Sequence, residues 1–536
     1  MQLDTTGIDP TDHALARRCS VGDVLTRAAD TFGPRVAITD PEGEWTYAQL
    51  ESVANRLARG LAELGVAEHE PVAIAAPNCR GFVAAYFGIA KAGMVALPVN
   101  LLSGAENIVH ALTDSGTRTL VAHAELLPLL AAAVGAVPAV DTVVVYGETG
   151  DAPLEAGSAR VLRWEDALSD DDSEPGVVIA DRQVAQCLYS SGTTSRPKGV
   201  LTSHLAVTMA GLGNAAVFSM GWGATAGVST LVLPLFHTAA LNGVLVTGVT
   251  VGATTHLLPG FDPETFARTV SRTRTSHLVA LPMMVEAMAE VADARGLDLS
   301  ALRHVIYAMA PMTDSQYERI RTVCPQASLV LGSGMSECTP ATVLQWPEDA
   351  PAKKDSWGHP SPTTLNRIVE PGTADPVATD VEGELVYRGP TVMEGYWNDP
   401  AANAAAFAGG VLHSGDLGRI DDENVVWFTD RVKDVVKSGG ENVSSLHVER
   451  VVADHPHVAE AAALGRPDPR WGERVVAVVV PAPGAPADVE LCASVLEYAA
   501  ERLTAAQRPR EVVVVDALPR TATGKIRKVA LRETFR

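Results

Sequence analysis

Apolar positions follow two different periods along the first four hundred residues. Apolar residues at helical spacing predict a helix over 45–64, closed by Gly65, and continuous apolar runs predict buried strands at 71–76 and 94–99. The patterns recur, with strands predicted at 119–122, 142–146, 186–189, 228–236, 277–281, 302–309 and 328–331, and helices at 82–92, 261–273, 282–294 and 314–324. Strands that alternate with helices predict mainly parallel sheets flanked by helices.

The pattern changes from Gly383 onward. Short strands and turns follow, including a hairpin over 417–428, and the polar run 429–436 precedes a compact α+β pattern. Helices are predicted there at 445–454, 488–503 and 526–535, and strands at 459–464, 474–480 and 511–515. We therefore predict an α/β fold with a large N-terminal domain over 1–429, a hinge at 430–433 and a small α+β C-terminal domain over 434–536. The Gly- and Pro-rich segment 147–181 is expected to be a surface excursion.

Composition and charge narrow the class of protein. A chain of 536 residues is too long for one ordinary core. The net charge of −22 argues against a general nucleic-acid binder, which needs a basic face. The six cysteines form no CxxC pair, no signal pattern opens the chain, and no uninterrupted apolar run reaches the ~18 residues of a membrane span. We expect a cytoplasmic protein without an integral membrane segment.

The stretch from Tyr189 to Val200 is the first candidate for chemistry. It combines a cation with donors and a flexible hinge: Ser190, Ser191, Gly192, Thr193, Thr194 and Lys198. Bare N–H groups, hydroxyls and a lysine suit a polyphosphate, although a Ser/Thr-rich surface turn has a similar composition. The stretch is not a Walker A loop, because Pro197 precedes Lys198 and Gly199 follows it. Lys198 is therefore not expected to open a helix.

Four further polar stretches have a similar character. Glu337, after Gly332, Ser333, Gly334, Met335 and Ser336, could hold a Mg²⁺ that bridges phosphates or serve as a helix N-terminal acid. Asp416 could hold the ribose hydroxyls or form an Asx turn. Residues 430–434 could act as hinge and ligand contact or as a solvated charged linker. The run from Pro519 to Lys525 is a donor-rich loop or an ordinary basic turn.

Together these stretches resemble the motifs of the adenylate-forming superfamily, the acyl-CoA synthetases, in order and spacing over nearly the whole chain. Residues 190–199 are similar to its phosphate loop, with Ser195 where glycine is usual, and 332–337 are similar to its Tyr-Gly-x-Thr-Glu motif. Residues 383–390 with 395–397 resemble its structural core motif, and Pro234 to His237 resemble the segment that gates the acyl pocket. Ser414 to Asp416 resemble the ribose-binding motif, 431–442 the hinge motif, and 519–525 the loop of the catalytic lysine.

The resemblance implies a fold and two half-reactions. It implies a β-barrel-like subdomain in the large domain and a mobile C-terminal cap. A carboxylate attacks ATP to give acyl-AMP and pyrophosphate, with Mg²⁺ held by Glu337 and Thr193, and coenzyme A then takes the acyl group. The implied catalytic residues are Lys525, Glu337, Lys437 and His237. The implied nucleotide contacts are Ser190, Ser191, Gly192, Thr193, Thr194, Lys198, Ala310, Pro311, Gly332, Ser333, Gly334, Met335, Ser336, Asp416 and Arg431, and Gly439 and Gly440 belong to the thiol step.

Departures from the family pattern bear on the substrate. Ser333 replaces a tyrosine that packs on adenine, and Ala308-Met309 replaces a Gly-Gly pair beside the carboxylate pocket. Added side chains should shorten or reshape that pocket, whose expected lining is His237, Met309 and Ser333, and a small or medium acid is expected. Ser444-Ser445 replaces a common Tyr-Pro pair, which we expect to be neutral.

Other functions remain open at this point. One is adenylation with another acceptor or substrate, such as a carrier-protein thiol, or nitrite activated for diazotisation of an aryl amine. Another is a non-catalytic nucleotide-binding protein on the same fold. A dehydrogenase is disfavoured. The run from Gly211 to Ala216 matches the dinucleotide-binding pattern GxGxxA only loosely, and a helix packing face explains it better. The sequence leaves the acid undefined and a homodimer open.

Overall fold

The computed structural model describes residues 7–148, 158–190, 196–308, 312–349, 352–520 and 526–535. The chain divides into two compact units, which are treated separately below. The first comprises the residues up to Ser190, Pro197–Leu365 and Arg388–Asn403, and the second includes Asn366–Tyr387 and Ala404–Arg536. The domain boundary predicted at residues 429 and 430 falls inside the second unit and stays a prediction.

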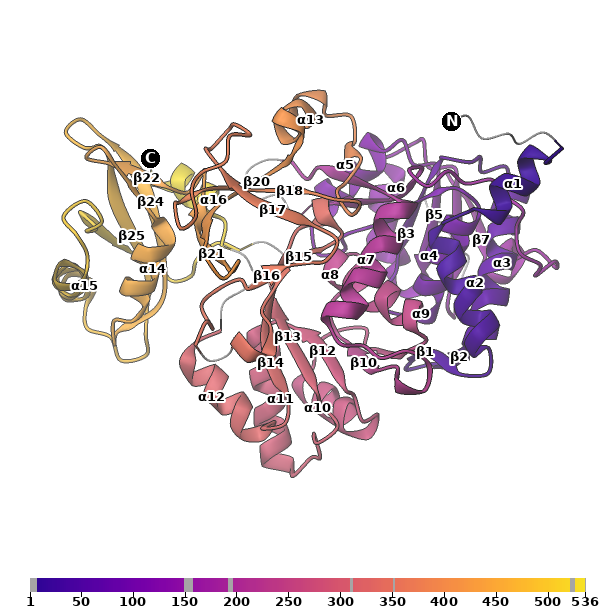
Figure 1. Cartoon of the computed structure of the whole chain (residues 1–536), viewed down its shortest axis with the longest axis horizontal. Helices are drawn as coiled ribbons and strands as arrows, with labels where there is room; N and C mark the ends of the chain where they lie inside the picture. Colours follow the sequence, from indigo (N-terminus) through magenta and orange to yellow (C-terminus); the bar gives the residue numbers. More distant parts are fainter. Residues whose placement is uncertain are drawn as a thin grey trace. The chain divides into compact units, whose positions relative to one another are not determined.

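The first unit contains an eight-stranded sheet (Figure 1). Its order is β19-β9-β8-β4-β3-β5-β6-β7; the pairs from β8 to β7 are parallel, whereas β9 is antiparallel to both its neighbours. The central strands are almost wholly apolar, as strands covered on both faces must be. The bounds are β3 (Pro71–Ala75), β4 (Val95–Pro98), β5 (Thr119–His123), β6 (Thr142–Tyr146), β7 (Arg160–Arg163), β8 (Val184–Tyr189), β9 (Gly199–Ser203) and β19 (Gly395–Tyr396).

A nine-stranded sheet is the second layer of this unit, in the order β16-β15-β14-β13-β12-β10-β11-β1-β2. Its strands from β14 to β1 are parallel, and the strands at both edges are antiparallel. The bounds are β1 (Val36–Asp40), β2 (Gly43–Thr46), β10 (Val228–Leu231), β11 (Thr254–Leu257), β12 (His277–Ala280), β13 (His304–Ala308), β14 (Ser328–Gly334), β15 (Ala341–Leu344) and β16 (His359–Pro360).

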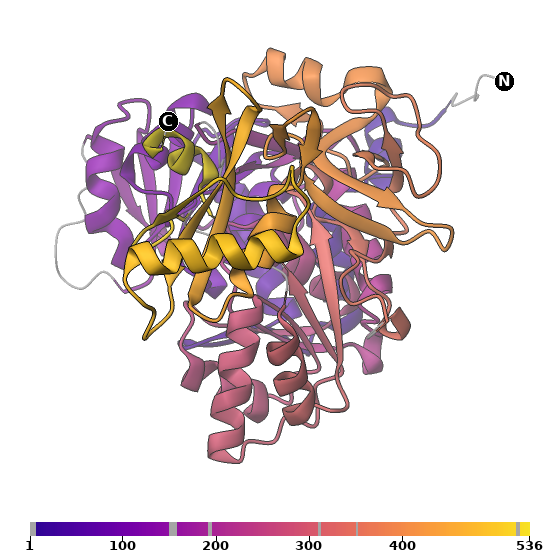
Figure 2. The same ribbon diagram turned by 90° about the vertical axis from the view of Figure 1, so that its left-hand side faces the viewer.

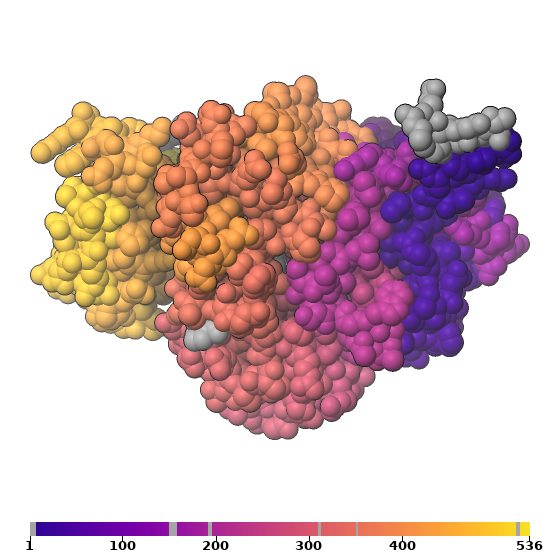
Figure 3. All heavy atoms as spheres, viewed as in Figure 1, coloured from indigo at the N-terminus to yellow at the C-terminus, as the bar shows by residue number. Residues whose placement is uncertain are grey.

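Helices cover the faces of both sheets. One hydrophobic cluster joins residues of both sheets, such as Ile74 and Ile38, to α2 (Val21–Phe32), α3 (Tyr47–Glu63), α4 (Arg80–Lys91), α7 (His204–Val217) and α9 (Thr247–Val251). A second cluster packs α5 (Ala105–Asp114) and α6 (Leu127–Gly135) on the eight-stranded sheet. A third packs α10 (Pro263–Arg272), α11 (Pro282–Arg295) and α12 (Asp314–Val323) on the nine-stranded sheet, and this segment forms one continuous surface region in Figure 3.

The second unit contains two smaller sheets. A four-stranded sheet is ordered β17 (Leu365–Val369), β18 (Gly383–Arg388), β20 (Leu412–Ile420) and β21 (Val426–Arg431). A five-stranded sheet contains β22 (Val436–Ser438), β23 (Glu441–Val443), β24 (Val458–Asp468), β25 (Gly472–Pro481) and β26 (Glu511–Val514). The helices α14 (Ser445–Ala453) and α15 (Asp488–Arg502) pack on one face of this sheet (Figure 2). The helix α16 (Lys528–Thr534) belongs to a second hydrophobic cluster, which contains β24 and β25 residues of the opposite face.

The predicted fold class is confirmed, and two predicted element boundaries are wrong. The strand expected over 228–236 ends at Leu231, before the turn that contains Pro234. The segment 147–181, expected to be a surface excursion, contains the edge strand β7, which pairs parallel with β6. The helix expected from Trp45 begins at Tyr47, because Trp45 belongs to β2 and Thr46 caps the helix with Gln49. Gly211 lies inside α7, where a Cβ would come 2.7 Å from Thr250, so the packing interpretation is correct.

A buried charge network lies at the predicted hinge. Asp430 is buried, and its Oδ2 accepts hydrogen bonds from the backbone N–H of Ser445 at 2.5 Å and from Ser445 Oγ at 2.8 Å. The interpretation of 430–434 as a solvated linker is therefore wrong for Asp430. The N-cap of α14 is Ser444. Proline could not donate the backbone hydrogen bond, so the substitution expected to be neutral carries a contact of its own.

The network continues to the last helix. Lys528 Nζ lies 2.7 Å from Glu449 Oε1 and 2.8 Å from Ser445 Oγ, and Arg532 pairs with Asp434 at 2.8 Å. Burial raises the pKa of Glu449, and the nearby Lys528 opposes this effect. Because the raised pKa makes the folded state bind more protons than the unfolded state, the contribution of Glu449 to stability falls as pH rises from the ordinary glutamate value through the folded pKa.

Lys528→Met should destabilise the protein by about 3 kcal/mol, the scale of a buried ion pair that loses one partner. The loss should be larger at pH 8 than at pH 5, because the unpaired Glu449 carboxylate can take up a proton at the lower pH. Urea unfolding at the two pH values measures the effect. The double variant Lys528→Met/Glu449→Gln is the control, since it removes the buried charge, keeps an acceptor for the Ala463 N–H and should recover most of the loss. An equal loss at both pH values would contradict this account.

Candidate active site

The two ends of the candidate phosphate loop are held together by backbone contacts. The loop connects β8 to β9, and its residues 191–195 lie outside the described part of the chain. The last residue pair of the two strands is Tyr189 with Gly199. Directly beyond it, Ser190 N–H donates to Lys198 O at 2.9 Å, and Lys198 N–H donates to Ser190 Oγ at 3.3 Å. Lys198 therefore enters an antiparallel strand, as the preceding proline predicts, and does not open a helix.

The Lys198 ammonium has two neighbours on the segment around β19. Its Nζ lies 3.4 Å from Asp399 Oδ2 and 4.8 Å from the centroid of the Tyr396 ring. A hydrogen bond from the Ala402 N–H and the nearby Lys198 cation both lower the pKa of Asp399. The lysine is half-buried, so its charge is oriented by these groups while remaining open to a ligand.

Tyr396 links this lysine to the candidate metal ligand. Its hydroxyl donates to Glu337 Oε1 at 2.9 Å, and burial raises the pKa of Tyr396, which keeps the hydroxyl protonated. Glu337 lies in a three-residue 3₁₀ helix (Ser336–Cys338) that follows β14. So short a helix has little dipole, which disfavours the interpretation of Glu337 as an ordinary helix N-terminal acid. The structure thus brings the phosphate-loop cation and the carboxylate into one site.

The backbone around Glu337 is held in a strained turn. Thr339 has a φ of 62°, which is a rare conformation for a β-branched residue. Its hydroxyl donates to Thr391 O at 2.9 Å, and Met393 N–H donates to Glu337 O at 2.8 Å. These contacts hold the strained turn that carries Glu337.

The other predicted residues of the first unit lie at strand ends. Gly332, Ser333 and Gly334 form the end of β14, with Met335 and Ser336 in the turn that follows. A Cβ at Gly334 would lie 2.0 Å from Pro340 O, so only glycine permits this close approach. His237 precedes a short helix, its Nδ1 accepts the Ala239 N–H at 3.3 Å, and a π-helix (Leu241–Val246) follows. Such π-helices are frequent at functional sites.

In the second unit, Asp416 and Arg431 face each other across β20 and β21. Arg431 Nε lies 3.0 Å from Asp416 Oδ1, and the Asp416 side chain is buried. Ser414 Oγ accepts the Asp416 N–H at 3.0 Å and donates to Leu385 O at 2.5 Å. Since Asp416 lies in a strand, the Asx-turn interpretation is wrong. The pair presents a carboxylate oriented by a guanidinium, a suitable arrangement for the two hydroxyls of a ribose.

The residues expected in the thiol step lie on the turn between β22 and β23. Lys437 is exposed on β22 and pairs with Asn442, while Gly439 and Gly440 have φ values of 62° and 85°. Gly439 N–H donates to Trp471 O at 2.8 Å, and a Cβ on Gly439 would lie 2.9 Å from the Trp471 ring. Both positions therefore have a left-handed backbone that favours glycine, and at Gly439 a side chain would also clash with the Trp471 ring.

Some predicted residues lie outside the described part of the chain. These are Ser191, Gly192, Thr193, Thr194, Met309, Ala310, Pro311 and Lys525. The roles given to them remain predictions.

The fit to Mg²⁺ rests on one carboxylate. Within the described ranges, no group of three or more His, Cys, Asp or Glu side chains could hold a metal ion. Mg²⁺ is commonly held by one or two carboxylates together with substrate phosphates, so a single Glu337 near Lys198 fits that mode and does not fit a protein-only metal cage.

Comparison with known proteins decides the family. Residues 25–397 match the family model described as AMP-binding enzyme, and residues 447–525 match the AMP-binding enzyme C-terminal domain. The chain belongs to the AMP-binding enzyme family. This places it in the adenylate-forming superfamily, as the sequence motifs predicted.

Individual relatives of this AMP-binding enzyme span most of its length. It is 31% identical over 524 residues to the long-chain-fatty-acid–CoA ligase FadD13 of Mycobacterium tuberculosis, covering 96% of this chain and 98% of the relative. It is 34% identical to a feruloyl-CoA synthase of an Amycolatopsis species, covering 91% and 94%. Its structure is similar to the crystal structure of the anthranilate CoA ligase AuaEII in complex with anthranoyl-AMP, with a TM-score of 0.83, 25% identity and coverage of 97% and 98%.

None of the helices built from the described residues is both long enough and apolar enough to span a bilayer.

Sequence reasoning missed three residues of the enzyme's site. Tyr396 was noted within a structural motif, but its bridge between Lys198 and Glu337 comes from the pairing of β19 with β9. Asp399 and Thr339 carried no sequence signal, because an isolated Asp or Thr is common in turns. Only the approach of segments about 200 residues apart places Tyr396 and Asp399 beside Lys198.

Proposed function

We propose that this AMP-binding enzyme activates a carboxylic acid with ATP as acyl-AMP, releases pyrophosphate, and transfers the acyl group to coenzyme A. The observation that carries the proposal is the contact series from Lys198 through Tyr396 to Glu337. A cation and a carboxylate that are linked by one tyrosine side chain suit the phosphates of ATP and a Mg²⁺ bound to them. Coenzyme A is proposed as the acyl acceptor because several relatives are CoA ligases.

Each predicted residue receives a task in this proposal. The segment from Ser190 to Lys198 holds the β- and γ-phosphates that leave as pyrophosphate. Asp416, oriented by Arg431, accepts hydrogen bonds from the ribose hydroxyls. Glu337 and Thr193 would hold a Mg²⁺ ion, which would supply positive charge to the phosphates when bound. The main demands of phosphoryl chemistry are alignment and charge stabilisation, and Lys525 supplies the second during acid activation.

The thiol step uses a different surface of the protein. We assign Lys437, Gly439 and Gly440 to it, on the exposed turn between β22 and β23. The C-terminal cap is proposed to rotate about Lys433. This rotation would withdraw Lys525 from the active site and bring in the turn between β22 and β23. His237 is proposed to gate the acyl pocket, with Met309 and Ser333 on its wall, and the bulk of Met309 favours a small or medium acid.

A panel of ATP–pyrophosphate exchange assays tests the function. Short, medium, long-chain and aryl acids are each assayed with Mg²⁺, and thioester formation is followed with and without coenzyme A. Acid-dependent exchange together with a CoA thioester is the expected result. Exchange only with nitrite plus an aryl amine, or acyl transfer only to a carrier protein, would replace the proposed substrate or acceptor. ATP binding without exchange for any acid would indicate a non-catalytic protein.

A further inference from the structure

One face of α5 contacts both ends of the candidate phosphate loop. His110 and Asp114 are four residues apart on this helix and therefore share a face. His110 Nε2 lies 3.0 Å from Pro197 O, directly before Lys198, while Asp114 Oδ2 accepts the Tyr189 hydroxyl at 2.7 Å. Because a carbonyl can only accept, His110 must carry its proton on Nε2.

The contacts of His110 and Asp114 extend to the neighbours of Lys198. The His110 ring packs edge-on against Tyr189, with centroids 5.9 Å apart and planes at 82°. Asn398 Nδ2 donates to Asp114 O at 2.9 Å, and the next residue, Asp399, pairs with Lys198. The helix thus fixes Lys198 twice, through the backbone before it and through the segment that orients its ammonium.

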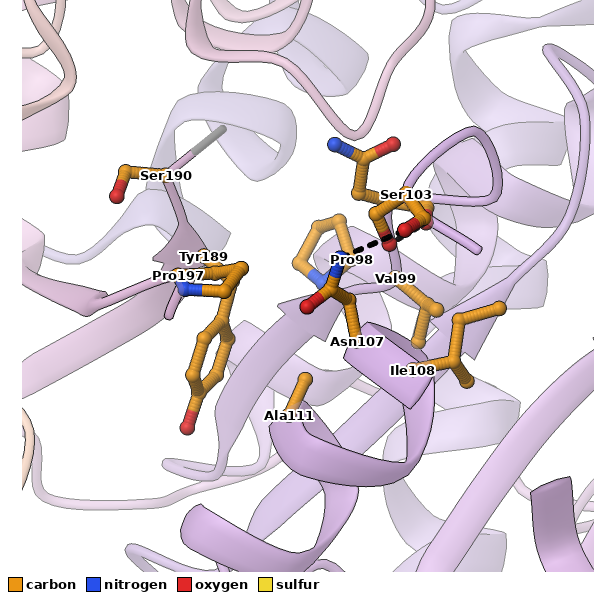
Figure 4. Close-up of a pocket in the computed structure, with 10 residues that line it drawn as sticks. Pro98, Val99, Ser103, Asn107, Ile108, Ala111, Tyr189, Ser190 and Pro197 are labelled. Carbon is orange, nitrogen blue, oxygen red and sulfur yellow. Dashed lines mark hydrogen bonds between the residues drawn. The ribbon is translucent and has the colours of Figure 1, made fainter. Parts of the chain in front are cut away.

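A small cavity lies beside this contact. Figure 4 shows Ser190 and Pro197 on one side of the cavity, with Asn107 and Ala111 of α5 on another. Asn107 Nδ2 donates to Ser103 O at 2.7 Å and is engaged within its own turn. On this side of the loop, His110 binds the Pro197 carbonyl.

We propose that His110 is a positioning residue for ATP: by donating to Pro197 O it fixes the backbone from which Lys198 reaches the phosphates. The inference rests on the proposed role of residues 190–198 in phosphate binding. It assigns to α5 a part in nucleotide use although no residue of this helix carries a phosphate-binding motif.

His110→Ala is expected to lower kcat/KM for ATP in pyrophosphate exchange about tenfold, as expected for one lost hydrogen bond of ordinary strength. KM for the acid and the conversion of supplied acyl-AMP to thioester should stay within about threefold of wild type, because neither uses the triphosphate. His110→Gln retains an N–H donor and should recover most of the loss. Thr113→Ala, an exposed change on the same helix, is the matched control and should have no effect.

The outcomes separate this inference from the proposal on which it rests. Lys198→Ala is measured in parallel. If Lys198→Ala impairs ATP use while His110→Ala does not, the positioning role is overturned. The same holds if His110→Ala affects ATP, acid and thioester steps equally, or if His110→Gln is as impaired as the alanine variant. If Lys198→Ala itself leaves ATP use unchanged, the phosphate-loop assignment fails. Should His110→Ala not fold, His110→Gln against His110→Asn repeats the comparison, because asparagine is too short to reach Pro197.

Discussion

Replacement of Lys525 by alanine should slow acyl-adenylate formation by about 10²–10³-fold, the scale of one removed electrostatic stabiliser. The reason is the negative charge that develops at phosphorus while pyrophosphate departs, which a lysine close to the α-phosphate would neutralise. Conversion of supplied acyl-AMP to the CoA thioester should be nearly unchanged, because Lys525 is proposed to leave the site before that step. ATP–pyrophosphate exchange and single-turnover thioester formation measure the two halves separately.

The control for this variant is Arg527→Ala. Arg527 is an exposed cation two residues beyond Lys525, so its removal changes the local charge equally. Normal pyrophosphate exchange in Lys525→Ala would refute the assignment. An equal loss in both half-reactions would instead indicate a general structural effect of the substitution.

Replacement of Gly440 by leucine should have the opposite effect. We expect thioester formation from supplied acyl-AMP to fall about 10²-fold, the scale of a reacting group displaced by about 1 Å, with adenylation nearly unchanged. Gly440 has a φ of 85° with no atom within 4 Å of an added Cβ, so leucine would strain the turn and place its bulk on the surface assigned to the thiol.

Gly484→Leu is a closely matched control. Gly484 has a φ of 83°, is also exposed and also has open space around an added Cβ, but it lies outside the motif of residues 431–442. If Gly440→Leu and Gly484→Leu affect thioester formation equally, backbone strain alone explains the loss. If Gly440→Leu leaves this step intact, the proposed exchange of surfaces is wrong for this enzyme.

Much of the fold follows from local patterns. The strands at 71–75 and 142–146 lie where short apolar runs predict them, because a strand buried on both faces needs an uninterrupted apolar segment. The helix at 282–295 begins at Pro282, as proline at a first turn predicts. Predictions of element boundaries are wrong where helix capping decides them, as at Thr46, which shifts the start of one helix. Strand pairing can also form an element that the pattern does not predict, such as β7, whose sequence is polar at both ends.

The candidate site divides in the same way. Lys198, Glu337, Asp416 and Arg431 are recognisable from the sequence because each lies in a short motif whose residue types suit one part of a nucleotide. The contacts of Tyr396, Asp399 and His110 are not recognisable, since the fold brings Tyr396 and Asp399 to Lys198 and His110 to Pro197. The hydrogen bond of His110 to Pro197 joins residues 87 positions apart, and no motif around His110 indicates it.

The sequence by itself determines the family, the alternation of strands and helices, and the set of groups that can meet a nucleotide, because these depend on residue type and spacing over short distances. The tertiary structure alone decides which groups act together. Tyr396 reaches Lys198 and Glu337 because β19 pairs with β9, and His110 reaches Pro197 because α5 packs beside the end of β8. Such contacts join residues far apart in the chain, and their geometry depends on how strands pair and helices pack across the whole domain.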